Sequence, residues 1–170
     1  MAHLSPRTPV AHDRVVSFVP RLLRARRSRS ALVRRVALEA LALCGVDWPS
    51  TVEVGPGLRL PGRSPRVVVH PWTRIGADVT FGRGVTVGEA VPWLRFHDDH
   101  RVRVVLCDGV VLEDGAVVVG SAGRPTVVGR GTVVRRGAIV TRSTGPDEVW
   151  AGNPARCVES RNVAEEGLRT

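Results

Sequence analysis

The sequence predicts a mainly β protein in which very short strands wind into a repeating coil, preceded by an α-helical segment. Three runs of apolar residues spaced six apart indicate the coil, because six is the period of neither a helix nor a simple strand. These runs are Val69, Ile75, Phe81 and Val87; Leu106, Leu112 and Val118; and Val128, Val134 and Val140.

The places after each apolar residue of the later runs indicate turns. The fourth place of the hexad is glycine, as at Gly109 and Gly131, and the fifth is a small or β-branched residue. A glycine at that place can adopt backbone angles that other residues avoid, so the chain can turn after a short flat strand. Successive turns of this kind place successive strands on different sides of a prism. We expect the first apolar residue of each hexad to point inward and stack on its counterpart one coil away. Several coils must stack, because one coil alone cannot bury this face.

Two segments resemble the hexapeptide-repeat acyltransferases. The run VWAGNPARCV is similar to the signature that closes the coil in that family. The run PSTVEVGPGLRLP, followed by VVVHPWTRIGADVTFGRGVTVG, resembles the serine acetyltransferase branch and its short relatives. The resemblance covers Trp48 to Val158 and implies a left-handed parallel β-helix, whereas the general rule for parallel crossovers favours the other hand.

The chain divides into an N-terminal helical segment at 1–47, the β-helix at 48–158 and a polar tail at 159–170. Apolar residues recur at helical spacing between Val15 and Cys44, with the basic cluster RLLRARRSRS among them. We expect these helices to cap the open end of the coil, as solenoids require. A basic amphipathic helix can also contact a membrane surface or an acidic partner.

Composition limits the partners and the compartment. A chain of 170 residues can bury one core. Its net charge of +9 suits an anionic partner such as acetyl-CoA, but all 25 basic residues are arginine, so the charge can equally reflect a general bias. We expect no nucleic-acid partner. Three cysteines without a spaced motif indicate reduced thiols in a cytoplasmic protein. The N-terminus has no secretory signal, and no apolar run is long enough to span a membrane.

One insertion interrupts the hexads, at 89–105, and it contains the run FHDDH. Insertions in repeat proteins gather on a functional face. Transfer of an acetyl group to a hydroxyl needs a base, and histidine suits that role. The resemblance implies His100 as the first candidate, with Asp98 or Asp99 orienting it, and His97 as the second. The alternative is a solvated polar loop.

His70 ranks third among the candidate bases. It lies in VVVHP, which matches a family placement that is often structural.

The resemblance also implies a groove for the pantetheine arm of acetyl-CoA, lined by backbone amides of small residues. The matching hexads, LEDGAV and VRRGAI, have Asp114 and Arg136 where glycine or alanine is usual. These two side chains could block the groove, pair with each other or point outward. The implied cofactor-binding residues are Gly115, Ala116, Gly137, Ala138, Thr141, Arg142 and Arg156.

Arginines near the groove, Arg136 among them, would suit the phosphates of CoA if they point outward. A solvated, arginine-biased surface is the alternative.

The family's early Asp-His pair falls at Pro61-Gly62 here, so the acceptor and catalysis itself stay open. The resemblance implies an acetyl-CoA-dependent O-acetyltransferase that acts on a small metabolite or sugar, assembled as a homotrimer or a dimer of trimers. The alternative is a non-catalytic assembly or regulatory subunit. A γ-carbonic-anhydrase-like metalloprotein, with His70, His97 and His100 as ligands, fits the spacing poorly.

Overall fold

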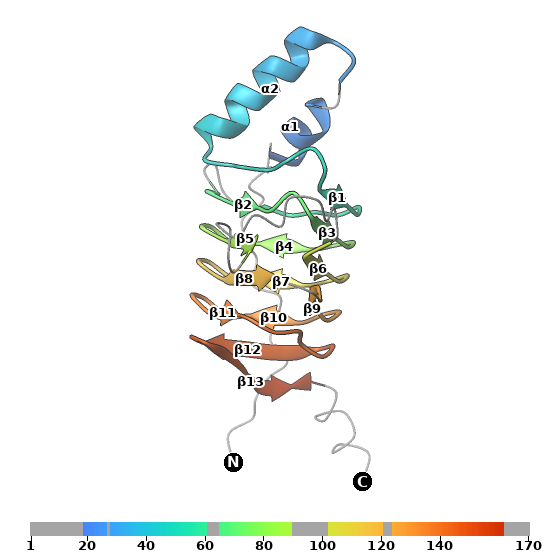
Figure 1. Cartoon of the computed structure of the whole chain (residues 1–170). Coiled ribbons are helices and arrows are strands. Elements are labelled where there is room, and N and C mark those ends of the chain that lie inside the picture. Colours follow the sequence, from blue (N-terminus) through green and yellow to red (C-terminus); the bar gives the residue numbers. More distant parts are fainter. Residues whose placement is uncertain (1–18, 27, 61–64, 90–101, 121–123, 162–170) are drawn as a thin grey trace, which may run out of the picture.

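A computed structural model describes residues 19–26, 28–60, 65–89, 102–120 and 124–161. Two helices, α1 (Val19–Ala25) and α2 (Ala31–Leu43), precede a stack of short strands (Figure 1). The strands are β1 (Glu53–Val54), β2 (Val68–Val69), β3 (Thr73–Ile75), β4 (Thr80–Phe81), β5 (Thr86–Glu89), β6 (Val104–Leu106), β7 (Val111–Leu112), β8 (Val117–Gly120), β9 (Thr126–Val128), β10 (Val133–Val134), β11 (Ile139–Val140), β12 (Glu148–Gly152) and β13 (Ala155–Ser160).

The strands form three sheets that the chain visits in turn. Their orders are β1-β3-β6-β9, β2-β5-β8-β11, and β4-β7-β10-β12-β13. All pairs are parallel except β12 with β13, a hairpin at the far end of the stack (Figure 1). Consecutive strands from β2 to β11 therefore lie on different walls of one prism, and each strand from β2 to β8 pairs with the strand three places further along the chain.

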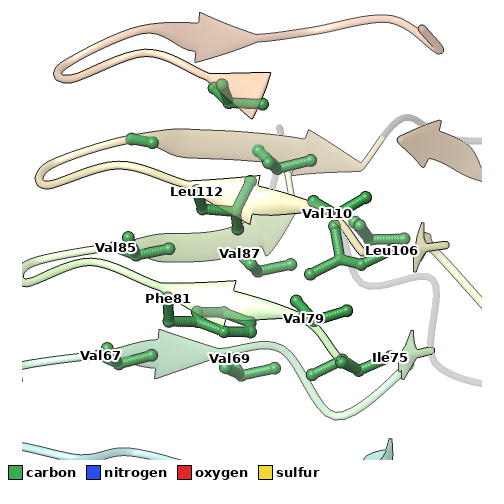
Figure 2. Close-up of a cluster of buried hydrophobic side chains, with 14 of the residues drawn as sticks. Val67, Val69, Ile75, Val79, Phe81, Val85, Val87, Leu106, Val110 and Leu112 are labelled. Carbon is green, nitrogen blue, oxygen red and sulfur yellow. The ribbon is translucent and has the colours of Figure 1, made fainter. Parts of the chain in front are cut away.

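The register confirms the predicted stacking of the hexads. Val69 pairs with Val87, Val87 with Val118, and Val118 with Val140, and all four side chains are buried. The other two walls repeat the pattern through Ile75, Leu106 and Val128, and through Phe81, Leu112, Val134 and Trp150. Figure 2 shows many of these side chains gathered between the walls. Each column stays dry because every coil supplies one apolar residue to it.

From β2 to β11, the coils differ in length at one corner. Val69 and Ile75, in the first full coil, are six residues apart, whereas Val87 and Leu106 are 19 apart. The next coil has a smaller insertion, because Val118 and Val128 are ten residues apart. The insertions are therefore 13 and 4 residues long. Both lie where the chain leaves the β2-β5-β8-β11 sheet and enters the β1-β3-β6-β9 sheet.

The helices cover the first coil, at the end of the stack opposite β13 (Figure 1). Val19 and Leu23 of α1 and Leu41 of α2 are buried in the same apolar cluster as Trp48. The hydroxyl of Ser30 caps α2 by accepting a hydrogen bond from the Val33 N–H. The helices therefore close the apolar interior of the coil on this side.

Candidate functional site at a coil corner

The candidate site lies at the corner where the chain leaves β2, β5 and β8 and enters β3, β6 and β9, which we call the His70 corner. His70 directly follows β2, and Glu89 ends β5. The register places Glu89 beside Gly120, the last residue of β8. The ends of three stacked strands therefore meet here, and both coil insertions begin here.

His70, Glu89 and Arg103 form a charged cluster at this corner. His70 Nε2 lies 3.5 Å from Glu89 Oε2, and Arg103 Nε lies 3.7 Å from Glu89 Oε1. The side chains are 21%, 13% and 8% exposed, respectively. Burial of charge is costly unless the charges are paired, and here one carboxylate lies between two nitrogen-bearing side chains.

The hydrogen bond to the His70 ring fixes its protonation pattern. The backbone N–H of Trp72 donates to His70 Nδ1 at 3.3 Å, so Nδ1 holds a lone pair. In the neutral ring the hydrogen is then on Nε2, the nitrogen that faces Glu89. Burial lowers the pKa of His70 from its ordinary value of 6.5; Glu89 opposes this shift, and Arg103 adds to it. Burial therefore favours the neutral imidazole of His70.

Two buried polar atoms at this corner make no hydrogen bond within the described part of the chain. They are Glu89 Oε1 and the hydroxyl oxygen of Thr73, the first residue of β3. Buried polar atoms are almost always hydrogen-bonded, so an exception often marks a place for water or a ligand. The packing is close, because a Cβ at Gly120 would lie 3.1 Å from the Arg103 Cβ.

The histidines predicted first and second, His100 and His97, lie outside the described residues, as do Asp98 and Asp99. Pro61 and Gly62 also lie outside them.

His70, ranked third from the sequence, is the candidate base that the described structure brings beside a carboxylate. Sequence reasoning missed Glu89 and Arg103. Their opposite charges at the two ends of the long insertion were the available signal.

The four small residues expected to line a pantetheine groove use their backbone N–H groups inside the coil. Gly115 donates to Arg83 O and Ala116 to Glu113 O. The other two, Gly137 and Ala138, donate to Asp114 O and Arg135 O. The side chains of both alanines are fully buried. A ligand on this surface would therefore have to contact other atoms of these hexads.

Asp114 and Arg136 form no ion pair with each other among the described residues. Asp114 Oδ1 instead accepts a hydrogen bond of 2.8 Å from the N–H of Arg83, one coil earlier. The N–H of Arg136 donates to Glu113 Oε2, and the residue is exposed. Asp114 thus ties two coils together, and Arg136 lies on the surface.

Thr141, Arg142 and Arg156 are all exposed. Thr141 and Arg142 directly follow β11, so they extend the His70 corner by one more coil. The Arg142 guanidinium lies 5.2 Å from the centre of the Trp150 ring, a cation–π contact that holds the arginine in place. Arg156 Nη1 donates to the Ala155 carbonyl.

Within the described ranges, no group of three or more His, Cys, Asp or Glu side chains could hold a metal ion. Of the three histidines considered as zinc ligands, the structure describes His70 alone. In the same ranges, neither helix is long and apolar enough to cross a membrane.

Solved structures of serine acetyltransferases have the same fold. The Neisseria gonorrhoeae enzyme in complex with serine matches with a TM-score of 0.66 and 20% identity, over 83% of this chain and 55% of that one. The soybean apoenzyme gives 0.59 and 28%, over 81% and 52%. A serine acetyltransferase in complex with cysteine gives 0.68 and 20%, over 89% and 57%. No protein-family model matches the sequence, and no curated protein is significantly similar to it.

The chain therefore has the left-handed parallel β-helix fold of the serine acetyltransferases, as the sequence predicts. It spans little more than half the length of the structures it matches.

Proposed function

We propose that the protein transfers an acetyl group from acetyl-CoA to a hydroxyl group of a small metabolite or sugar. The observation that carries this proposal is the match to serine acetyltransferases over more than four fifths of the chain. The soybean enzyme, at 28% identity, adds support from the sequence. The name of the matched enzymes suggests serine as one acceptor to test.

The His70 corner is the proposed place of the reaction. Acyl transfer needs a base for the hydroxyl proton and donors for the oxyanion. The sequence resemblance suggests His100, His97 and Asp99 for the base and its orienting carboxylate, all in the insertion that begins at this corner. The structure adds a half-buried histidine beside a carboxylate at the same corner, which supports catalysis there.

The placement of Arg142 supports an acetyl-CoA that lies along this corner, parallel to the axis of the coil. His70 follows β2 and Arg142 follows β11, and β5 and β8 lie between these strands in the sheet. Three steps of about 4.8 Å separate the two positions, about 14 Å in all. An extended pantetheine arm can bridge this distance, with its thioester near His70 and its phosphates near Arg142. Arg156 and Thr141 are further candidates for the phosphate end, since all three residues are exposed.

Calorimetric titration of acetyl-CoA tests the proposal. We expect saturable binding near one site per subunit, weakened several-fold by Arg142→Ala through loss of a phosphate contact. Arg130→Ala is the matched control, because Arg130 is also exposed but lies at a different corner, between β9 and β10. It should bind like the unaltered protein. Absence of binding at millimolar ligand, with the protein folded, would contradict an acetyltransferase.

We also propose a homotrimer as the working assembly, with a dimer of trimers as an extension through the helices. An exposed apolar face of α2 supports the extension: Leu32 and Leu43 are 73% and 87% exposed, and Val36 lies between them. Patches of this kind on a helix commonly mark contacts between proteins. A peripheral membrane contact of the arginine-rich helices and a cytoplasmic location remain predictions from the sequence.

A non-catalytic assembly or regulatory subunit is the second candidate. It is favoured by Pro61-Gly62 at the family's Asp-His place and by the engaged N–H groups of the expected groove residues. This alternative predicts a folded oligomer that neither binds acetyl-CoA nor hydrolyses or transfers its acetyl group.

A further inference from the structure

We propose that His70 is the general base of the acetyl transfer, and that Glu89 is the carboxylate that orients its ring. This inference rests on the proposed acetyltransferase function. It assigns the base to His70 instead of to His100 or His97, which the sequence resemblance suggests, or to the place of the family's early pair, where this chain has Pro61-Gly62.

The hydrogen pattern of the ring is that of a base oriented by a carboxylate. Such a histidine points its N–H at the carboxylate and offers the lone pair of its other nitrogen to the proton that it removes. In His70, Nε2 faces Glu89 Oε2 at 3.5 Å, and Nδ1 holds the lone pair. That lone pair accepts one long bond of 3.3 Å, from the Trp72 N–H. Exchange of this weak local bond for a substrate hydroxyl therefore has a small cost.

His70 is more exposed than Glu89, as expected for a base that meets the substrate and a carboxylate that lies behind it. His70 has 21% of its side chain exposed, so the imidazole can meet a substrate at the surface. Glu89 is 13% exposed, and its Oε1 is buried without a hydrogen bond among the described residues. A carboxylate in a dry environment interacts more strongly with the imidazolium that forms during the reaction.

The proposed step moves one proton and one acetyl group. The acceptor hydroxyl gives its proton to His70 Nδ1 while its oxygen forms a bond to the thioester carbonyl carbon. The tetrahedral intermediate then breaks its C–S bond, and the sulfur of CoA leaves with the electron pair of that bond. The protonated His70 returns the proton to the sulfur, so the products are the acetyl ester and CoA thiol, and no co-reactant is needed.

The charged side chains around His70 make the proposal testable through pH. Among the described residues, those that face its ring are Glu89 from β5 and Arg103, just before β6. The pKa of His70 lies below its ordinary value of 6.5 because of burial. Loss of the negative charge of Glu89 should lower that pKa further, and loss of the positive charge of Arg103 should raise it.

The experiment is the pH profile of kcat/KM for the full-length protein with acetyl-CoA and a hydroxyl acceptor, serine first. The acid limb of the unaltered enzyme should coincide with the titration of the His70 ring followed by NMR, a comparison that needs no variant. Glu89→Gln should move this limb to lower pH, and Arg103→Gln should move it to higher pH. His70→Gln should lower kcat/KM by about 100-fold or more, the usual contribution of a general base.

Glu53→Gln is the matched control, because Glu53 forms an ion pair with Arg74 at the surface, at 2.7 Å. It should leave both the rate and the pH profile unchanged. A rate for His70→Gln within twofold of the unaltered enzyme, or an acid limb that does not follow the His70 ring, overturns the inference while the acetyltransferase stands. An unaltered protein that binds no acetyl-CoA overturns the proposed function and the inference together.

Discussion

Two glycines at coil corners should respond very differently to one added methyl group. Gly129 is buried in the corner after β9, and a Cβ built there overlaps the carbonyl group of Gly145 in the next coil and lies 2.7 Å from Pro146 N. Gly137 has a φ of +67°, and a Cβ there meets nothing within 4 Å. Gly129→Ala therefore tests the close approach of two coils, and Gly137→Ala tests backbone conformation alone.

The expected losses of unfolding free energy follow from these geometries. For Gly137→Ala, the left-handed backbone costs about 1–2 kcal/mol, and the stiffer unfolded chain returns about 0.4–1 kcal/mol, which leaves a net loss of roughly 1 kcal/mol. The backbone of Gly129 is not left-handed, so the overlap is the destabilising contribution there, and the stiffer unfolded chain offsets about 0.4–1 kcal/mol of it, as at Gly137. Overpacking of a dense interior costs about 1–3 kcal/mol or more, and here the obstacle is backbone that cannot rotate away. We expect a loss of about 3 kcal/mol.

Urea unfolding of both variants at one fixed protein concentration measures this difference, because assembly makes stability depend on concentration. Gly129→Ala should unfold at a clearly lower urea concentration than Gly137→Ala. Equal losses, or a larger loss for Gly137→Ala, would refute the contact between the corner at Gly129 and the following coil.

Three further predictions use single side chains. Asp114→Ala should lower the unfolding free energy by about 1 kcal/mol in urea, because the bond to the Arg83 N–H between coils is lost, whereas Asp114→Asn keeps the acceptor oxygen and should cost less. Leu43→Glu should reduce the mass of the assembly in light scattering, and Ala42→Glu, exposed on another side of α2, should not. Equal effects would contradict an α2 interface. Because the pKa of His70 is lowered by folding, the unfolded chain takes up its proton first as pH falls below 6.5, and stability is lost. Between about pH 7.5 and about pH 5.5, His70→Gln should therefore lose less unfolding free energy than the unaltered protein.

The interior of the coil could be predicted from the sequence almost residue by residue. Each hexad places one apolar side chain in the interior of the coil. The position of Val87 in its hexad therefore predicts Val69 and Val118 as its neighbours. The insertion after Gly88 could also be predicted, because it interrupts the six-residue spacing of the apolar residues. The handedness came from the family resemblance, since the repeat period is the same for either hand.

The charged cluster could not be predicted in the same way. His70, Glu89 and Arg103 belong to two successive coils, and their contact depends on where each falls in the turn. Spacing in the sequence says little about this, because the insertion between Glu89 and Arg103 has no repeat. The partner of the Asp114 side chain could not be predicted either. Its bond to a backbone N–H one coil earlier depends on how the coils stack at that corner.

The three corners of the coil divide structural and chemical roles between them. From β3 to β11, the two corners without insertions are tied by bonds from coil to coil, such as Gly109 N–H to Ala77 O and Gly115 N–H to Arg83 O. These bonds need turns of one length, and an insertion there would break them. At the His70 corner, the bonds between coils join residues that follow the insertions, such as Arg103 N–H to Trp72 O and Thr126 N–H to Arg103 O. This corner can therefore accept insertions of 13 and 4 residues in successive coils while the apolar columns keep their register. A charged cluster can be buried at this corner without disturbing the walls. We therefore expect substitutions at the His70 corner to change activity more than stability, and substitutions at the other two corners to do the reverse.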